Sequence, residues 1–215
     1  MTDTLPDLSP IEARVLGVLI EKERTTPDVY PLTVNSLTAG CNQKTSRDPV
    51  LSLKESEVQE ALEALRSRNL VLETYGASGR VLRYAHNFTK TYGLPGPMVP
   101  LLAVLVLRGY QTASELRANC ERLYSFADAS AVEAYLEELA ERDQPLAVKL
   151  PRQPGAREQR WTHLLCGPVD MTQPLAAAVA PASVSTTGLE ARVVALENEV
   201  AELRQKLQGL LDSLA

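Results

Sequence analysis

Few residues of this chain have the types and spacing that catalysis requires. The two histidines, His86 and His163, stand at equivalent places on two predicted strands, each two residues after an aromatic side chain. A catalytic or metal-binding histidine would be expected in one half only, so both are interpreted as structural or hydrogen-bonding groups. The sequence contains no H-E-x-x-H, G-x-S-x-G, Walker A, G-x-G-x-x-G or paired-cysteine zinc pattern. We therefore predict that the protein is not an enzyme and uses no metal or cofactor.

Cysteine usage and hydropathy predict a protein of the cytoplasm. Cys41, Cys120 and Cys166 form no C-x-x-C pair and are odd in number, as expected of reduced thiols, and the first two are interpreted as buried packing residues. The first ten residues contain no basic segment followed by an apolar one, so no secretory signal is expected. The longest apolar run, 98–107, has about half of the roughly 20 residues that a membrane span needs. No membrane partner is expected.

Cations in predicted loops and hairpins could bind phosphate. Ten lysines and arginines gather there: Lys44, Arg47, Lys54, Arg80, Arg83, Lys90, Lys149, Arg152, Arg157 and Arg160. Duplex DNA is the usual partner of a helix followed by such a hairpin, because the helix enters the major groove while the hairpin contacts phosphate. The predicted nucleic-acid-binding residues are Lys44, Arg47, Lys54, Ser56, Gln59, Arg80, Arg83, Arg157 and Arg160.

Acidic residues on the predicted long helices argue against DNA binding. They are Glu57, Glu60 and Glu63 on the first helix, and Glu133, Glu137, Glu138 and Glu141 on the second. Carboxylates repel phosphate and release no counterions, and the net charge of −5 argues in the same direction. If either helix enters DNA, it is the first, whose N-terminal end carries Lys54, Ser56 and Gln59. The second region is interpreted as a dimerisation or partner-binding module.

A helix over 52–68 followed by a hairpin is the main unit predicted in the first half of the chain. Its apolar residues Val58, Ala61, Leu62 and Leu65 recur with the 3.6-residue period, and Ser52 with Glu55 makes a capping box. Extended runs over 70–75 and 80–85 flank a glycine-containing turn. Two shorter helices are predicted before it, one from Ser9 to about Glu23 and one from Thr33 to Cys41. This order is typical of a winged helix.

The same order returns in the second half of the chain. Ser130, Val132, Leu136, Leu139 and Arg142 correspond to Ser56, Val58, Leu62, Leu65 and Arg68. Thr112, Leu116 and Cys120 likewise correspond to Thr33, Leu37 and Cys41, and Trp161 corresponds to Tyr84. A tandem duplication explains these matches. We predict winged-helix domains over 1–92 and 93–167, separated at the Gly- and Pro-rich segment 92–97.

The C-terminal part is predicted to be a flexible linker over 168–188 and a coiled-coil helix over 189–215. The linker is rich in Pro, Ala, Ser and Thr. The helix carries a heptad with Val193, Val200, Leu207 and Leu214 at a, and Leu189, Leu196, Leu203 and Leu210 at d. This pattern favours a parallel dimer, so the protein is expected to pair with itself through these eight residues. Packing of the helix on its own domains is the alternative.

The polar loop from Asn42 to Pro49 has two open interpretations. Its amides, Lys44 and Arg47 could form a binding surface. It could equally be a solvated connector in which Asp48-Pro49 forms a turn.

Several dense motifs resemble one bacterial family. They are Leu19 to Glu23, Thr25 to Pro27, Tyr30 to Leu32, Asn35, Cys41 to Lys44, Arg47, Pro49-Val50, Ser56 to Val58, Leu107 to Gly109, Gln111-Thr112, Glu115 to Arg117, Pro154-Gly155, Arg157, Arg160 and His163. Residues 9–167 resemble the YceH-like family of tandem winged-helix proteins without an established activity. The resemblance implies two winged helices and no catalytic residues, and it does not extend to the heptad tail.

The sequence thus predicts an α+β, mostly helical protein with two tandem winged helices, a linker and a coiled-coil helix. We expect a dimeric DNA-binding protein that regulates transcription. The alternative is a protein-interaction scaffold whose acidic long helices bind a basic partner.

Overall fold

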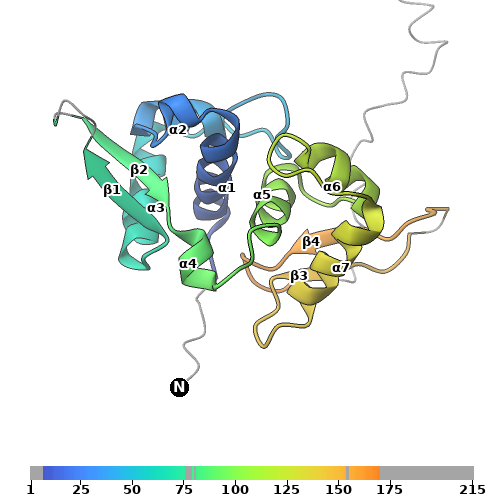
Figure 1. The fold of residues 1–215 in the computed structure, drawn as a ribbon. Helices are drawn as coiled ribbons and strands as arrows, with labels where there is room; N and C mark the ends of the chain where they lie inside the picture. The colour runs from blue at the N-terminus through green and yellow to red at the C-terminus, as the bar shows by residue number, and fades with distance from the viewer. Residues whose placement is uncertain (1–6, 76–78, 80, 154, 170–215) are drawn as a thin grey trace, which may run out of the picture. The chain divides into compact units, whose positions relative to one another are not determined.

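A computed structural model describes residues 7–75, 79, 81–153 and 155–169, and the described residues form an α+β structure. In chain order its elements are α1 (Pro10–Thr25), the 3₁₀ helix η1 (Pro27–Val29), α2 (Val34–Cys41), α3 (Glu55–Ser67), β1 (Val71–Tyr75), β2 (Leu82–His86), α4 (Phe88–Tyr92), α5 (Met98–Arg108), α6 (Ala113–Cys120), α7 (Ala129–Ala140), β3 (Ala147–Lys149) and β4 (Trp161–His163) (Figure 1). Arg80, the linker beyond residue 169 and the predicted coiled-coil helix lie outside the described residues, so they stay predictions.

Two halves of the chain repeat one order of elements. The first contains α1, α2, α3 and the antiparallel pair β1–β2, and the second contains α5, α6, α7 and the antiparallel pair β3–β4. A single extended residue joins each sheet: Leu32 pairs with Tyr84, and Gln111 pairs with Trp161. Both halves belong to one compact unit. Their division into two domains at residue 92 therefore stays a prediction.

Side-chain caps fix where several helices begin. Thr33 accepts a hydrogen bond from the Ser36 amide (3.2 Å), and Thr112 accepts one from the Glu115 amide (3.1 Å), as expected of N-cap threonines. The helix predicted from Ser52 instead begins at Glu55.

The physical reason for this late start is the side chain of Asn42. Its amide donates to the Leu53 carbonyl and accepts from the Leu53 N–H, each at 2.8 Å, so this segment stays extended. The cap then comes from Glu57, whose carboxylate accepts from the Lys54 N–H at 2.8 Å. The predicted capping box of Ser52 with Glu55 is therefore wrong, and the start of the helix has instead the single cap that Glu57 provides to the Lys54 N–H.

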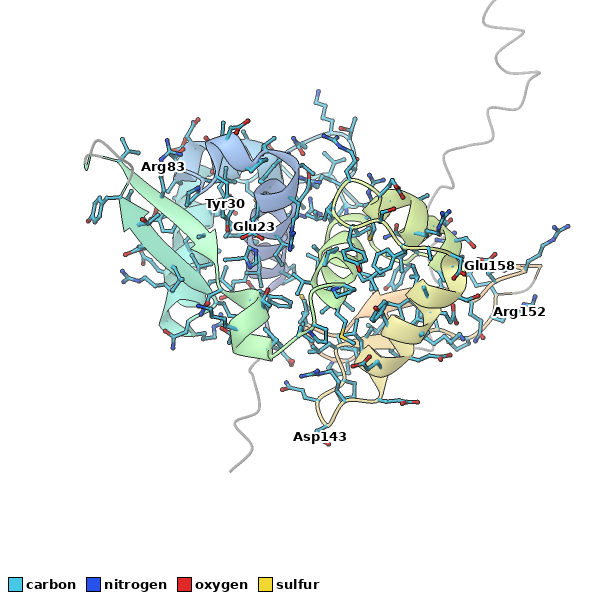
Figure 2. All side chains as sticks on the ribbon, viewed as in Figure 1. Glu23, Tyr30, Arg83, Asp143, Arg152 and Glu158 are labelled. Carbon is cyan, nitrogen blue, oxygen red and sulfur yellow. The ribbon has the colours of Figure 1, made fainter. Side chains whose placement is uncertain are left out.

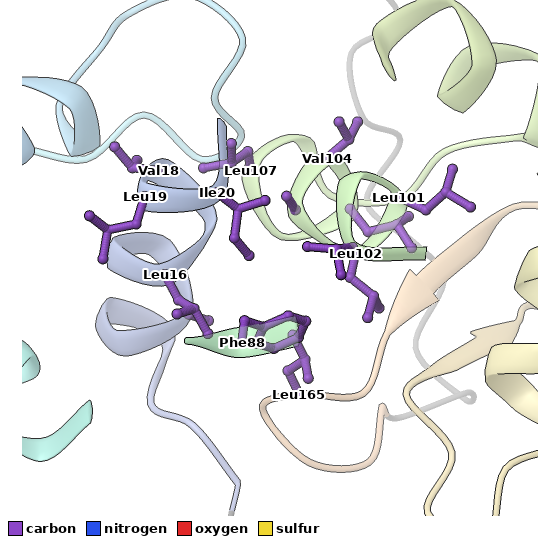
Figure 3. Close-up of a cluster of buried hydrophobic side chains, with 14 of the residues drawn as sticks. Leu16, Val18, Leu19, Ile20, Phe88, Leu101, Leu102, Val104, Leu107 and Leu165 are labelled. Carbon is purple, nitrogen blue, oxygen red and sulfur yellow. The ribbon is translucent and has the colours of Figure 1, made fainter. Parts of the chain in front are cut away.

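The centre of the structure is the contact between α1 and α5, which lie side by side between the two hairpins (Figure 1). Residues 12–20 of α1 are all buried, so this helix contacts neighbours on every side. At Gly17 an added Cβ would lie 3.1 Å from Val106, which shows how closely the helices approach. Leu16, Ile20, Leu107 and other apolar side chains fill this contact (Figure 3).

No helix within the described ranges is both long and apolar enough to cross a bilayer.

Candidate interaction surfaces

Arg47, predicted to bind phosphate, lies inside the protein. Its side chain is 0% exposed, and its guanidinium forms an ion pair with Glu21 at 2.7 Å. It also donates to the Gly40 and Ser46 carbonyls and to the Gln43 side chain, at 3.1, 2.9 and 2.8 Å. A guanidinium must be exposed to contact phosphate, and that of Arg47 is buried here. Its role is to attach the loop to α1.

The whole polar loop joins the two halves. The Asp48 N–H donates to the Leu107 carbonyl at 2.8 Å, and Arg108 donates to the Ser46 hydroxyl at 2.7 Å. Arg14, from α1, donates to the carbonyl of Pro49 at 2.8 Å. These bonds order the loop, while Lys44 to Ser46 and Asp48-Pro49 are exposed, so the binding surface and the solvated connector both stay open interpretations. Only its outer side, which includes the exposed Lys44, is available to bind another molecule.

Two hairpin arginines of the predicted phosphate site also have internal partners. Arg83 donates to the carbonyl of Pro31 at 2.7 Å and to that of Val29 at 3.2 Å (labelled in Figure 2). Arg160 donates to the Tyr110 carbonyl at 2.6 Å and pairs with Glu115 at 3.1 Å. Both side chains therefore hold their hairpin against the segment beside it.

The remaining predicted residues are accessible but separated. Lys54 and Ser56 are exposed at the start of α3, and Arg157 is exposed on the loop between β3 and β4. Gln59 is half-buried, and its amide lies 3.4 Å from both the Tyr84 hydroxyl and the Glu63 carboxylate. Among the described residues, the exposed cations of the predicted nucleic-acid-binding set thus belong to the start of α3 and its preceding loop in the first half, and to the β3–β4 loop in the second.

An acidic groove lies in the second half of the chain, on the face that contains α7 and β3. Its volume is about 480 Å³. It is lined by α6, α7, β3 and the loop before β4, through Ala113, Ser114, Ala129, Ser130, Glu133, Ala134, Glu137, Lys149, Glu158 and Gln159. Ser114 donates to Glu158 at 3.2 Å, which brings the hairpin loop (Figure 2) toward α6.

The one cation of this groove is already paired. Lys149 forms an ion pair with Glu133 and lies 4.0 Å from Glu137. Its ammonium also lies over the Trp161 ring, 5.4 Å from the centroid. Three carboxylates and one ammonium line the groove, so its lining keeps a net negative charge. Alanine side chains on its walls leave room for an incoming chain.

Sequence reasoning found only part of this groove. It identified the acidic residues of α7 and placed Lys149 on the second hairpin. It missed Ser114, Glu158 and Gln159, because they come from segments far apart in the chain and carry no common period. Since the cavity exists only after α6, α7 and the β3–β4 loop pack together, no local signal could have identified it.

Burial determines the protonation of two thiols and of His163. Cys41 and Cys120 are buried as predicted, and burial raises the pKa of each thiol to about 12, which keeps them protonated and unreactive. The His86 Nε2 lies 3.1 Å from the Glu23 carboxylate, whereas burial lowers the pKa of His163 to about 4. In the part of the chain that the structure describes, no group of three His, Cys, Asp or Glu side chains could hold a metal ion.

The comparison with known proteins defines the class of this chain. The family described as "Protein of unknown function, DUF480" matches residues 8–156, and the chain belongs to that family. A "UPF0502 protein" of Acidovorax sp. (strain JS42) is 56% identical, covering 98% of this chain and 95% of the relative. A "UPF0502 protein" of Leptothrix cholodnii is 52% identical over 97% and 96% of the two chains. The relatives are bacterial, and their names state no activity.

Proposed function

We propose that this protein is an interaction scaffold made of two tandem winged helices, and that its second half binds a basic segment of a partner protein. The repeated order of three helices and a hairpin, together with the YceH-like motifs, supports the winged-helix interpretation. The observation that carries the function is the charge of the groove, whose lining contains three carboxylates, Glu133, Glu137 and Glu158, and one ammonium, the paired Lys149. Lysine or arginine side chains of a partner would complement it.

The acidic residues of α7 make DNA binding by the second winged helix unfavourable. The face of α7 that would approach the major groove carries carboxylates, which repel phosphate. In the first half, Lys44, Lys54 and Ser56 are exposed around the start of α3 and could still contact a nucleic acid. Duplex DNA binding, transcription regulation and dimerisation through the C-terminal helix therefore stay predictions, and the first half would carry the DNA contacts.

The decisive experiment measures binding of a fluorescent peptide with an arginine at every third position, by anisotropy. A double variant, Glu137→Gln with Glu158→Gln, removes two groove carboxylates. Its matched control, Glu138→Gln with Glu141→Gln, removes two exposed carboxylates at α7 that do not line the groove. We expect the groove variant to weaken binding by about fivefold, because exposed ion pairs contribute roughly 0.2–1 kcal/mol each. The control should bind like the natural protein.

Equal weakening by both variants would show that net charge alone attracts the peptide, and it would refute the groove. A parallel titration with random-sequence duplex DNA tests the other candidate. Salt-sensitive binding that is lost on Lys44→Ala with Lys54→Ala, and unaffected by the groove variant, would support DNA binding by the first half. No DNA binding at low salt would exclude it.

A further inference from the structure

A second cavity lies at the junction of the two halves. Its volume is about 290 Å³, close to the lower end of the range for small-molecule sites. Its walls come from four segments that are far apart in the chain: the start of α1, the loop at 48–51, the end of α5, and the segment from Thr162 to Cys166. Much of the lining is apolar and includes Pro10, Ala13, Leu51, Leu105 and Val106. A ligand here would contact both halves at once.

Arg14 gives this cavity a buried positive charge. The residue is only 3% exposed, and its guanidinium donates to the carbonyls of Cys41 and Pro49 at 3.3 and 2.8 Å. Both acceptors are neutral, and Arg14 has no carboxylate within ion-pair distance among the described residues. A guanidinium has five N–H donors, so three remain after these bonds. The Asp48 carboxylate acts on Arg14 only from beyond ion-pair distance, so an anion that pairs directly with the guanidinium would relieve the cost of burying this charge.

A second group in the cavity also lacks a partner. His163 lines it, and the buried Nδ1 of this residue makes no hydrogen bond within the described part of the chain. Buried polar atoms are normally hydrogen-bonded, so an orphaned ring nitrogen at a cavity wall is consistent with a polar ligand there. The hydroxyl-bearing residues Tyr110 and Thr162 also line the cavity. Asp48 lines it too, and its carboxylate lies beside Gly109 on the same wall. Burial lowers the pKa of Arg14, and the negative charge of Asp48 opposes that shift by raising it.

We propose that this cavity binds a small organic acid with an aliphatic body, whose carboxylate pairs with Arg14. Carboxylates accept two parallel N–H bonds from a guanidinium, which provides both charge neutralisation and orientation. The aliphatic body would lie against Leu51, Leu105 and Val106. This site is separate from the acidic groove and does not depend on the function proposed for that groove. Because its walls come from both halves, an occupied cavity would stabilise their junction.

The test is a titration of the ¹⁵N-labelled full chain with 4-methylpentanoate, followed by NMR chemical shifts. The neutral 4-methylpentanamide has nearly the same shape and lacks the charge. We expect saturable shifts at the amides of Arg14, Val106 and Thr162 with millimolar or tighter affinity for the acid, and at least tenfold weaker binding of the amide. Arg14→Met should reduce the preference for the acid to less than threefold.

Two further variants keep the test decisive. Arg108→Met removes another partly buried guanidinium at this junction that does not line the cavity, so it should leave binding unchanged. Leu51→Trp, at a partly exposed wall residue, should fill the cavity and abolish binding even if Arg14→Met does not fold. Equal binding of acid and amide, unaltered binding to Leu51→Trp, or no saturable shift at these amides would each overturn the proposal.

Discussion

Replacing Arg47 by methionine should destabilise the protein strongly, although the residue belongs to a polar surface loop in sequence. Methionine keeps the unbranched apolar stem of the side chain and removes its charge and donors. The change leaves the Glu21 carboxylate, whose side chain is 16% exposed, without the guanidinium at 2.7 Å, and only Lys22, 3.2 Å from its other oxygen, stays paired with it. It also leaves the Gly40 and Ser46 carbonyls without the donors at 3.1 and 2.9 Å. Removing one partner of a buried pair costs about 3–5 kcal/mol.

We expect about 3 kcal/mol for Arg47→Met, at the lower end of that range, because Glu21 keeps some contact with water. Glu21→Gln should cost less, since the guanidinium retains its three other acceptors. In the double variant the two costs should not add, and the coupling between them should be about 1–2 kcal/mol. A conservative Arg47→Lys should recover only part of the loss, because an ammonium cannot reach all four partners in the same geometry.

The measurement is equilibrium unfolding in urea. The fluorescence of Trp161, the one tryptophan of the chain, reports on the second half, and circular dichroism reports on the helices of both. If the loop joins the halves as described, both signals should shift to lower urea together in Arg47→Met. A cost below 1 kcal/mol, or additive effects of the two single variants, would refute the view that this pair holds the junction.

Three other changes test the interior. Burial lowers the pKa of His163 from 6.5 to about 4, so the unfolded chain binds the proton first. Stability should therefore fall by about 3 kcal/mol as pH drops from 6.5 to 4, and urea unfolding of His163→Gln should lose that dependence. Gly40→Ala should destabilise the protein by about 1–3 kcal/mol, because the new Cβ would lie 2.7 Å from Val18. This cost exceeds the gain from the higher helix propensity of alanine. A variant that is stabilised in thermal unfolding would contradict this packing. Asn42→Ala should cost about 1–3 kcal/mol by the same assay through its two bonds to Leu53, whereas a neutral effect would show that these bonds do not hold the loop.

Local patterns were enough to predict most individual elements. The N-cap threonines Thr33 and Thr112 identified the starts of α2 and α6, and the apolar stripe identified α3. The first strands were shifted by only a residue or two from the observed β1 and β2. These signals are local, because a cap or a stripe depends on residues within a few turns of one another.

Long-range packing accounts for what the sequence did not reveal. A helix from Ser9 to about Glu23 was predicted, but its packing against α5 was not, and this contact helps to bury every residue from 12 to 20. The late start of α3 depends on Asn42, eleven residues before its partner Leu53. Arg47 lies in a segment of polar composition, and only the position of Glu21 on α1 shows that its charge is satisfied inside. None of these partners follows from periodicity.

The two halves show how a repeated fold can present different chemistry at one place. The helix residue beside the buried aromatic ring of the sheet is Gln59 in the first half, where its amide faces the Tyr84 hydroxyl. In the second half the corresponding residue is Glu133, and Lys149 lies between it and the Trp161 ring. A neutral contact has thus been replaced by a charged one, within a groove that has two more carboxylates. The apolar residues that correspond in the two halves are buried in both, so the two faces differ through polar residues of one helix and one hairpin.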